Sequence, residues 1–319
     1  MSLKAIVKFF DDFFFKPAPV HTVAILRIAL GVLLFFHWFS LWNNLDFFWS
    51  PDGIISLETA VKYNGLYRFG LFELLPDDVR ASAFLALLNL LGVIGMTLGL
   101  FTRTSTALTF LTLISFHNRN IFILNSADVV LRNFLFLMIL SPAGDCLSLD
   151  RLVRRWRGTA SVVADKSPWA LRLMQVQLSV IYIATVMFKL KGNAWVDGTA
   201  VYTATRLDEF VRFPLPLLNH LLLLKLLTWG TLAVEFALGT LIWIKELRYW
   251  VLLAGISLHL GIEMTMIIPL FEWVMIAMMI VQVPPQDMKK FLQAVSDRLR
   301  AKRWTVPESA GSRAFTMGK

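Results

Sequence analysis

Long apolar runs, repeated along the whole chain, constrain the fold more than any other feature of the sequence. A helix that crosses a bilayer needs about 20 mostly apolar residues. Eight segments meet or approach this length, at 22–42, 81–101, 104–121, 127–142, 169–189, 219–243, 248–267 and 270–283. Those at 104–121, 127–142 and 270–283 are short or carry polar residues, and the other five are more continuous. The sequence therefore predicts an all-α polytopic transmembrane helical bundle of about eight spans.

The composition excludes an ordinary soluble domain. Hydrophobic residues make up 57% of the chain and charged residues only 17%, whereas an average soluble domain has ~25% charged residues. The net charge of +9 is dispersed between apolar segments, which favours the lipid bilayer over nucleic acid as the partner. Because Cys146 is the single cysteine, an intramolecular disulfide and a cysteine zinc site are both excluded.

The distribution of Lys and Arg predicts the orientation. With eight spans and a cytoplasmic N-terminus, 19 of these residues fall on the inner side and 8 on the outer side, as the positive-inside rule requires. Both termini are then cytoplasmic. We expect a membrane domain over residues 1–284, with an amphipathic segment at 1–18. Residues 285–319 are expected to form a basic cytoplasmic tail, which is an amphipathic helix to about residue 303 and disordered beyond it.

Charged residues inside spans are costly unless they are paired. Arg27 lies in the first predicted span and Glu235 in the sixth, at a similar expected depth above the inner face. They are predicted to form a structural ion pair or to reach the inner interface, with an anion or headgroup site as the functional alternative. Gly92, Gly95 and Gly99 in the second span are predicted to allow close helix packing.

A second polar group is expected at the outer ends of the spans. Lys189 ends the apolar run Leu178–Phe188, and burial beside Lys191 would favour the neutral amine, which can act as a base. The alternative is a lysine that reaches the interface. His259 and Glu263 are four residues apart and share a helix face, but two such groups do not make a metal site. The whole group is His117, Arg119, Asn125, Asp128, Lys189, Lys191, His259, Glu263 and Glu272.

Four blocks in order, over residues 20–285, resemble a known family. They are Leu26-Arg27 with Gly31; Gly92-x-x-Gly95-Met96-x-Leu98-Gly99-Leu100 with Arg103; Gln177-x-x-x-x-Tyr182 followed by Lys189-Leu190, Trp195-Val196 and Gly198; and His259 with Phe271. Together they resemble the horizontally transferred transmembrane (HTTM) domain, which many bacterial proteins contain. They are similar in particular to the membrane core of vitamin K-dependent gamma-carboxylase.

The resemblance implies an enzyme of a bacterial inner membrane that acts on a lipid or quinone-like substrate at the outer leaflet. In the carboxylase a lysine deprotonates reduced vitamin K, and the position that matches it is Lys189. A vitamin K-like quinol is the cofactor that the resemblance implies. The pocket would then contain, besides Lys189, the residues Lys191, Trp195, His259, Glu263, Asp128, Asn125 and His117.

The sequence also departs from the carboxylase. Asn125-Ser126-Ala127-Asp128 stands where the carboxylase has an Asn-Asn-His block, and the spacing from Lys189 to Trp195 is one residue longer. The carboxylase also has a large soluble C-terminal region that binds its protein substrate, whereas only the short tail follows the last predicted span here. Recognition of a substrate would therefore depend on loops at the membrane or on a membrane or extracytoplasmic protein partner. A non-catalytic protein that binds lipid or a partner stays open as the alternative. A transporter is disfavoured because no internal repeat is evident.

Overall fold

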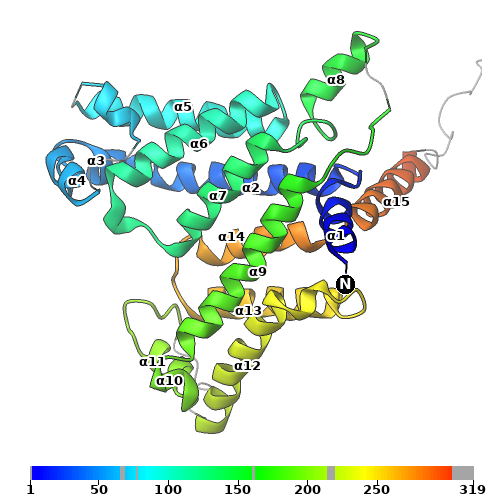
Figure 1. Cartoon of the computed structure of the whole chain (residues 1–319). Helices are drawn as coiled ribbons and strands as arrows, with labels where there is room; N and C mark the ends of the chain where they lie inside the picture. The colour runs from blue at the N-terminus through cyan, green and yellow to red at the C-terminus, as the bar shows by residue number, and fades with distance from the viewer. Residues whose placement is uncertain (1, 65–68, 77, 160–161, 214–219, 304–319) are drawn as a thin grey trace, which may run out of the picture.

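The computed structural model describes residues 2–64, 69–76, 78–159, 162–213 and 220–303. These residues form helices joined by turns and two isolated β-bridges, without any β-strand (Figure 1). The chain begins with α1 (Leu3–Phe15), where the Ser2 hydroxyl accepts a hydrogen bond from the Ala5 N–H. The prediction of an all-α fold is confirmed for the described residues.

Four helices are long and apolar enough to cross a membrane. They are His21–Trp49, which joins α2 (His21–Leu41) to α3 (Leu45–Trp49), and α5 (Val79–Leu98), α9 (Trp169–Lys189) and α12 (Leu221–Gly239). Each corresponds to a predicted span. The chain is therefore a multi-pass membrane protein.

The other predicted spans are shorter or more polar helices. They are α6 (Thr102–Arg119), α7 (Ser126–Leu140), α13 (Arg248–Thr265) and α14 (Phe271–Met278). The segment at 248–267, predicted as a continuous span, forms α13 but lies outside the four apolar helices, because polar side chains occur near both of its ends. The total of about eight spans and the cytoplasmic termini stay predictions.

Short helices occupy the connections. They are α4 (Leu57–Asn64), α8 (Leu149–Trp156), α10 (Asn193–Val196) and α11 (Ala200–Ala204), and α15 (Pro285–Arg303) follows the bundle. In Figure 1, α3 and α4 lie at one end of the bundle, whereas α1, α8 and α15 lie at the other. Helix α15 occupies the segment where an amphipathic helix is expected, and the expected disordered tail beyond it lies outside the described residues.

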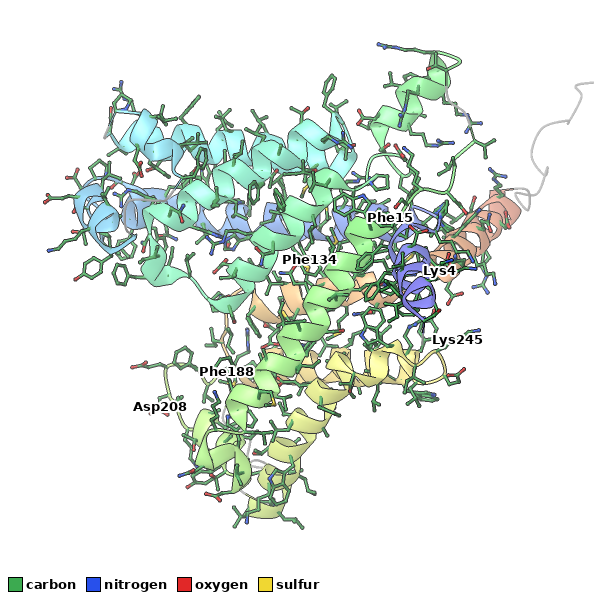
Figure 2. All side chains as sticks on the ribbon, viewed as in Figure 1. Lys4, Phe15, Phe134, Phe188, Asp208 and Lys245 are labelled. Atoms are coloured by element: carbon green, nitrogen blue, oxygen red, sulfur yellow. The ribbon has the colours of Figure 1, made fainter. Side chains whose placement is uncertain are left out.

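The surface of the bundle is apolar. Phe39 and Leu222 are 72% and 71% exposed, and many other large apolar side chains point away from the ribbon (Figure 2). A soluble protein rarely leaves so much large apolar surface in water. Meanwhile Leu26, Leu30 and Phe134 are fully buried between the helices. This arrangement, apolar both inside and outside, is that of a protein whose solvent is lipid.

Small residues bring α5 close to α6, as the glycine pattern predicts. A Cβ atom added at Gly92 would lie 2.8 Å from the Thr109 hydroxyl, and one added at Gly95 would lie 3.0 Å from the Ser105 Cβ. Gly99 has a different role, because its φ of 70° is left-handed and ends α5. Gly99 is thus the C-cap, a position that favours glycine, and its close packing is against Ser148 and against Arg27 of α2 rather than against α6.

The predicted ion pair between Arg27 and Glu235 is wrong. Arg27 is fully buried, and its guanidinium donates to the carbonyls of Met96, Thr97, Ala143 and Leu147. The first two belong to the last turn of α5, where carbonyls lack the partners that a continuing helix would supply; the Met96 carbonyl accepts in addition from the Gly99 N–H of the C-cap. Arg27 therefore ties α2 to the end of α5 and to the loop between α7 and α8, and the span that contains it needs no carboxylate partner.

Helices α9 and α12 are antiparallel but staggered. Near the end of α12, the Trp243 indole donates to the Ser179 hydroxyl over 2.9 Å. The first part of α12 instead contacts α10 and α11: the Trp229 indole donates to the Val196 carbonyl, and the Val201 N–H donates to the Thr228 hydroxyl. At 1.5 Å per residue, α12 extends roughly 20 Å beyond the end of α9.

Candidate functional site

Lys189 and Glu235 form an ion pair between α9 and α12. The Lys189 ammonium donates to the Glu235 carboxylate, and the two side chains are 24% and 10% exposed. The Lys189 Nζ also lies 4.6 Å from the centre of the Trp195 ring. The Thr185 hydroxyl donates to the other oxygen of Glu235 over 3.4 Å. The pair is thus surrounded by protein on several sides but remains accessible at Lys189.

This contact changes the expected depth of both residues. The sequence places Lys189 at the outer membrane edge and Glu235 near the inner face, and both expectations cannot hold for two side chains in contact. The cause is the stagger, because the residues 221–234 of α12 extend beyond Lys189. Helix ends predicted from hydropathy do not fix how neighbouring helices are aligned.

A second polar cluster joins α9, α13 and α14. The Tyr182 hydroxyl lies 2.9 Å from His259 Nε2, and His259 Nδ1 contacts the Glu272 carboxylate. All three side chains are almost fully buried, and the Oε1 atom of Glu272 has no hydrogen-bond partner. A carboxylate that contacts one ring nitrogen fixes the orientation of the imidazole toward the hydroxyl at the other. The cluster is therefore a preorganised acid–base group inside the bundle.

Three predicted pocket residues lie together elsewhere. The Asn125 side chain accepts from the Ala127 N–H, and Asp128 accepts from the Asn125 N–H over 2.8 Å, which makes a capping box at the start of α7. His117 Nε2 lies 3.5 Å from Asp128. Asn125 also donates to the Pro269 carbonyl. Asp128 thus caps a helix, and no hydrogen bond or ion pair among the described residues links this group to Lys189.

The other predicted pocket residues, Glu263 and Lys191, contact different parts of the protein. Glu263 forms an ion pair with Arg212 over 2.8 Å, although it shares a helix with His259. Lys191 Nζ lies 4.9 Å from the centre of the Phe188 ring. Of the eight predicted pocket residues, Lys189 and Trp195 are in contact with each other, whereas the contacts described for the other six do not include Lys189. Within the described residues, no group of three or more His, Cys, Asp or Glu side chains could hold a metal ion.

Two residues of the site were missed by the sequence-based interpretation. Tyr182, Thr185 and Lys189 are separated by three and four residues, so they share one face of α9. Tyr182 contacts His259, and Thr185 contacts Glu235. A polar stripe at helical spacing within an otherwise apolar helix was the available signal.

The all-helical bundle, its apolar surface and its buried polar pairs define a multi-pass membrane protein. The chain belongs to the HTTM domain family, because the family model of the HTTM domain matches residues 15–286. A comparison with curated proteins finds no match. A comparison with solved structures likewise finds none.

Proposed function

We propose that this protein binds a lipid-soluble, quinol-like hydroxyl compound beside Lys189 and removes its proton, in the inner membrane of a bacterium. The observation that carries the proposal is the ion pair of Lys189 and Glu235, which lies between two apolar helices and is partly exposed only on the lysine side. Ionisable pairs at such positions are costly and mark functional sites more often than those on a soluble surface.

The proposed step transfers one proton from the substrate hydroxyl to the pair. Lys189 passes the proton that it shares with Glu235 to the carboxylate, and its amine then accepts the proton of the hydroxyl. The products are a substrate oxyanion beside the Lys189 ammonium and a protonated Glu235. Proton and charge balance, and the oxyanion is stabilised by the cation next to it.

The surroundings of the pair support this role. Trp195 covers one side of the Lys189 ammonium, and limited access of water strengthens each electrostatic contact there. The Thr185 hydroxyl of α9 lies 3.4 Å from the Glu235 carboxylate and adds a polar neighbour to it. Apolar surface near Lys189, including Val196 at 56% exposure, suits an isoprenoid or acyl substrate better than a soluble one.

The test is native mass spectrometry of the protein extracted with its own lipids. We expect a co-purifying quinone or related lipid, and we expect it to be lost from Lys189→Ala and retained in Lys191→Ala. Lys191 is the matched control, because it is a neighbouring lysine that contacts Phe188 rather than the pair. Absence of any such compound from every preparation of the parent protein would contradict the proposal.

A second pair of variants separates function from folding. Lys189→Ala leaves the buried Glu235 carboxylate unpaired, which destabilises the protein by itself. The double variant Lys189→Met with Glu235→Leu removes both charges and keeps apolar packing, so it is expected to fold. Loss of the bound compound from this folded variant supports the proposal, and retention of the compound refutes it.

The alternative is a non-catalytic protein that binds lipid or a membrane or extracytoplasmic partner. The observation that favours it is that Lys189 and Glu235 satisfy each other, as in a structural contact between α9 and α12. This alternative predicts that the double variant keeps both its stability and its cellular phenotype. In that case a structural contact between α9 and α12 is enough to account for the ion pair.

A further inference from the structure

A wide cavity opens at the opposite end of α9, away from Lys189. Its volume is about 950 Å³, and it lies where α7 ends, where α6 and α9 begin, and beneath α8. Four cationic side chains line it: Arg103 of α6, Arg154 of α8, Arg157 just after α8, and Lys166 of the following segment. Figure 1 shows α8 standing away from the ends of α5 and α6.

The two carboxylates that line the cavity are already occupied. Asp150 accepts hydrogen bonds from the Phe101 and Thr102 N–H groups. Asp145 pairs with Lys166 over 2.6 Å and lies 4.0 Å from Arg154. These contacts belong to the fold, so they leave the cavity with a surplus of positive charge.

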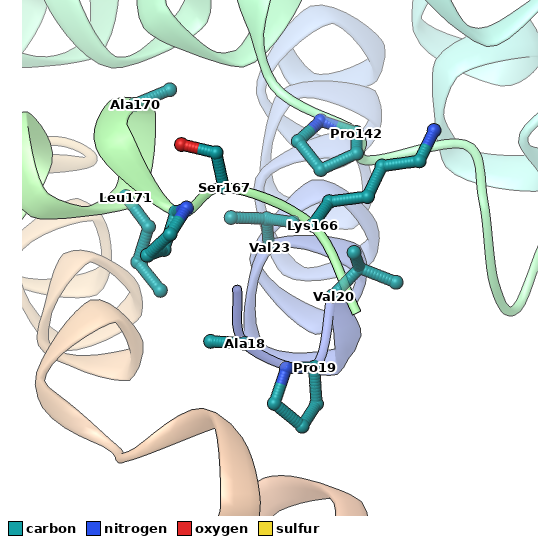
Figure 3. Close-up of a pocket in the computed structure, with 10 residues that line it drawn as sticks. Ala18, Pro19, Val20, Val23, Pro142, Lys166, Ser167, Ala170 and Leu171 are labelled. Carbon is teal, nitrogen blue, oxygen red and sulfur yellow. The ribbon is translucent and has the colours of Figure 1, made fainter. Parts of the chain in front are cut away.

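Arg103 and Arg157 carry that surplus. Both side chains are exposed, and neither forms an ion pair with any residue that the structure describes. The backbone of Lys166 is fixed, because it exchanges two hydrogen bonds with the backbone of Ala18. Figure 3 shows its side chain extending past Pro142, away from Ala18. The cavity therefore presents guanidinium and ammonium donors to a ligand with several acceptor oxygens.

The cavity is also partly apolar. Phe101, Leu140 and Trp169 contribute to its lining, and Phe101 is 71% exposed. Helix α8 has the same dual character, because Leu152 and Trp156 are exposed on a helix whose other residues include three arginines. Exposed Trp and Leu beside Arg on a short helix are typical of the boundary between lipid headgroups and acyl chains.

We propose that this cavity binds the phosphate headgroup of an anionic phospholipid, with Arg103 and Arg157 as its principal phosphate ligands. Lys166 and Arg154 complete the cationic wall. The acyl chains leave the cavity along Phe101 and Leu140 into the bilayer. A soluble phosphate compound shares the headgroup chemistry but would not use this apolar exit, so we assign the site to a lipid. The assignment is independent of the reaction proposed at Lys189.

The test uses the full chain, stripped of lipid in detergent and titrated with lipids under native mass spectrometry. Dioleoyl-phosphatidylglycerol is the anionic probe, and dioleoyl-phosphatidylcholine is the zwitterionic one. The variant is Arg103→Gln with Arg157→Gln, and the matched control is Lys289→Gln with Lys290→Gln, which removes the same charge from α15. Two cations near a headgroup account for roughly a thirtyfold change in affinity. We expect that weakening for phosphatidylglycerol in the variant alone.

The outcomes divide clearly. An equal loss in the variant and the control would show general attraction between charges and would overturn the proposed site, as would equal binding of the two lipids by the parent protein. Glycerol 1-phosphate is the soluble arm: binding of this compound without the lipid would overturn the lipid assignment. Thr104→Trp, which adds bulk to the cavity wall and removes no charge, is expected to weaken phosphatidylglycerol binding as well. Unchanged melting temperatures would show that these substitutions do not alter folding.

Discussion

Arg27 allows a quantitative test of how the bundle is held together. Its guanidinium donates four hydrogen bonds, to the carbonyls of Met96, Thr97, Ala143 and Leu147. In Arg27→Met the side chain has a similar length but no donor. The Met96 carbonyl keeps its hydrogen bond from the Gly99 N–H. Each of the other three buried carbonyls costs about 1 kcal/mol or more when it loses its partner, and removal of a buried charge offsets part of that cost. We expect a net loss of about 3 kcal/mol in the free energy that keeps this region closed.

Cys146 makes this loss measurable. It is the single cysteine of the chain, it lies in the loop that Arg27 holds, and it is only 4% exposed. Burial raises the pKa of its thiol to about 11, so the closed protein reacts slowly with a maleimide near neutral pH. A loss of about 3 kcal/mol increases the open fraction roughly a hundredfold. Alkylation of Arg27→Met is therefore expected to be about a hundredfold faster than that of the parent protein.

Two further variants complete this experiment. Arg27→Lys keeps the charge but cannot reproduce the planar fork of donors, so its alkylation rate is expected to be intermediate. Arg172→Lys is the control, because Arg172 bonds to the Phe13 carbonyl and Gln175 and does not contact the loop. If Arg27→Met is alkylated at the rate of the parent protein, Arg27 does not hold the loop closed and the reasoning is refuted.

Three other predictions concern stability in detergent, measured by thermal unfolding. For Asp150, burial opposes ionisation, but the hydrogen bonds from Thr102 and Phe101 outweigh it and lower the pKa; Asp150→Asn should therefore cost about 1 kcal/mol at neutral pH. This contribution is present above the ordinary aspartate pKa and is lost as the pH falls through the lower folded value, so an equal loss in the variant and the parent protein on acidification would contradict it. Gly95→Leu should prevent close packing of α5 on α6, whereas Gly261→Leu, where an added Cβ meets nothing within 4 Å, should be tolerated; equal tolerance of both would contradict the predicted contact. Tyr182→Phe should cost about 1–3 kcal/mol by leaving a buried ring nitrogen unpaired, and an unchanged melting temperature would argue against that hydrogen bond.

Apolar periodicity predicted the fold class well, because the length and composition of a membrane helix are local properties. The segments around 22–42, 81–101, 169–189 and 219–243 all became long apolar helices. The segment at 248–267, predicted as a continuous span, forms a helix but falls outside the four apolar ones, since polar groups such as Arg248, His259 and Glu263 lower its mean hydropathy. Packing against α12 and α14 stabilises α13 where its own hydropathy is low. A prediction made from one segment at a time does not include contacts between helices.

The polar sites were harder to predict, because they depend on which helices meet and at what level. Arg27 and Glu235 were paired on charge and expected depth alone. Arg27 instead uses carbonyls, which every sequence contains, so no residue type in the sequence indicated its partners. Glu235 contacts Lys189 because α12 is shifted along α9. The short helices α10 and α11, which contact the part of α12 beyond α9, carry little hydropathy signal.

The geometry of α9 also bears on whether the two proposed sites depend on each other. Trp169, the first residue of α9, lines the basic cavity, and Lys189 is its last residue. A helix of 21 residues is about 30 Å long, which approaches the thickness of the hydrocarbon core of a bilayer. One headgroup therefore cannot contact both sites, and sites so far apart without shared partners usually behave additively. Arg103→Gln with Arg157→Gln should then leave the compound bound near Lys189 in place, and loss of that compound from this variant would show that the two sites communicate through α9.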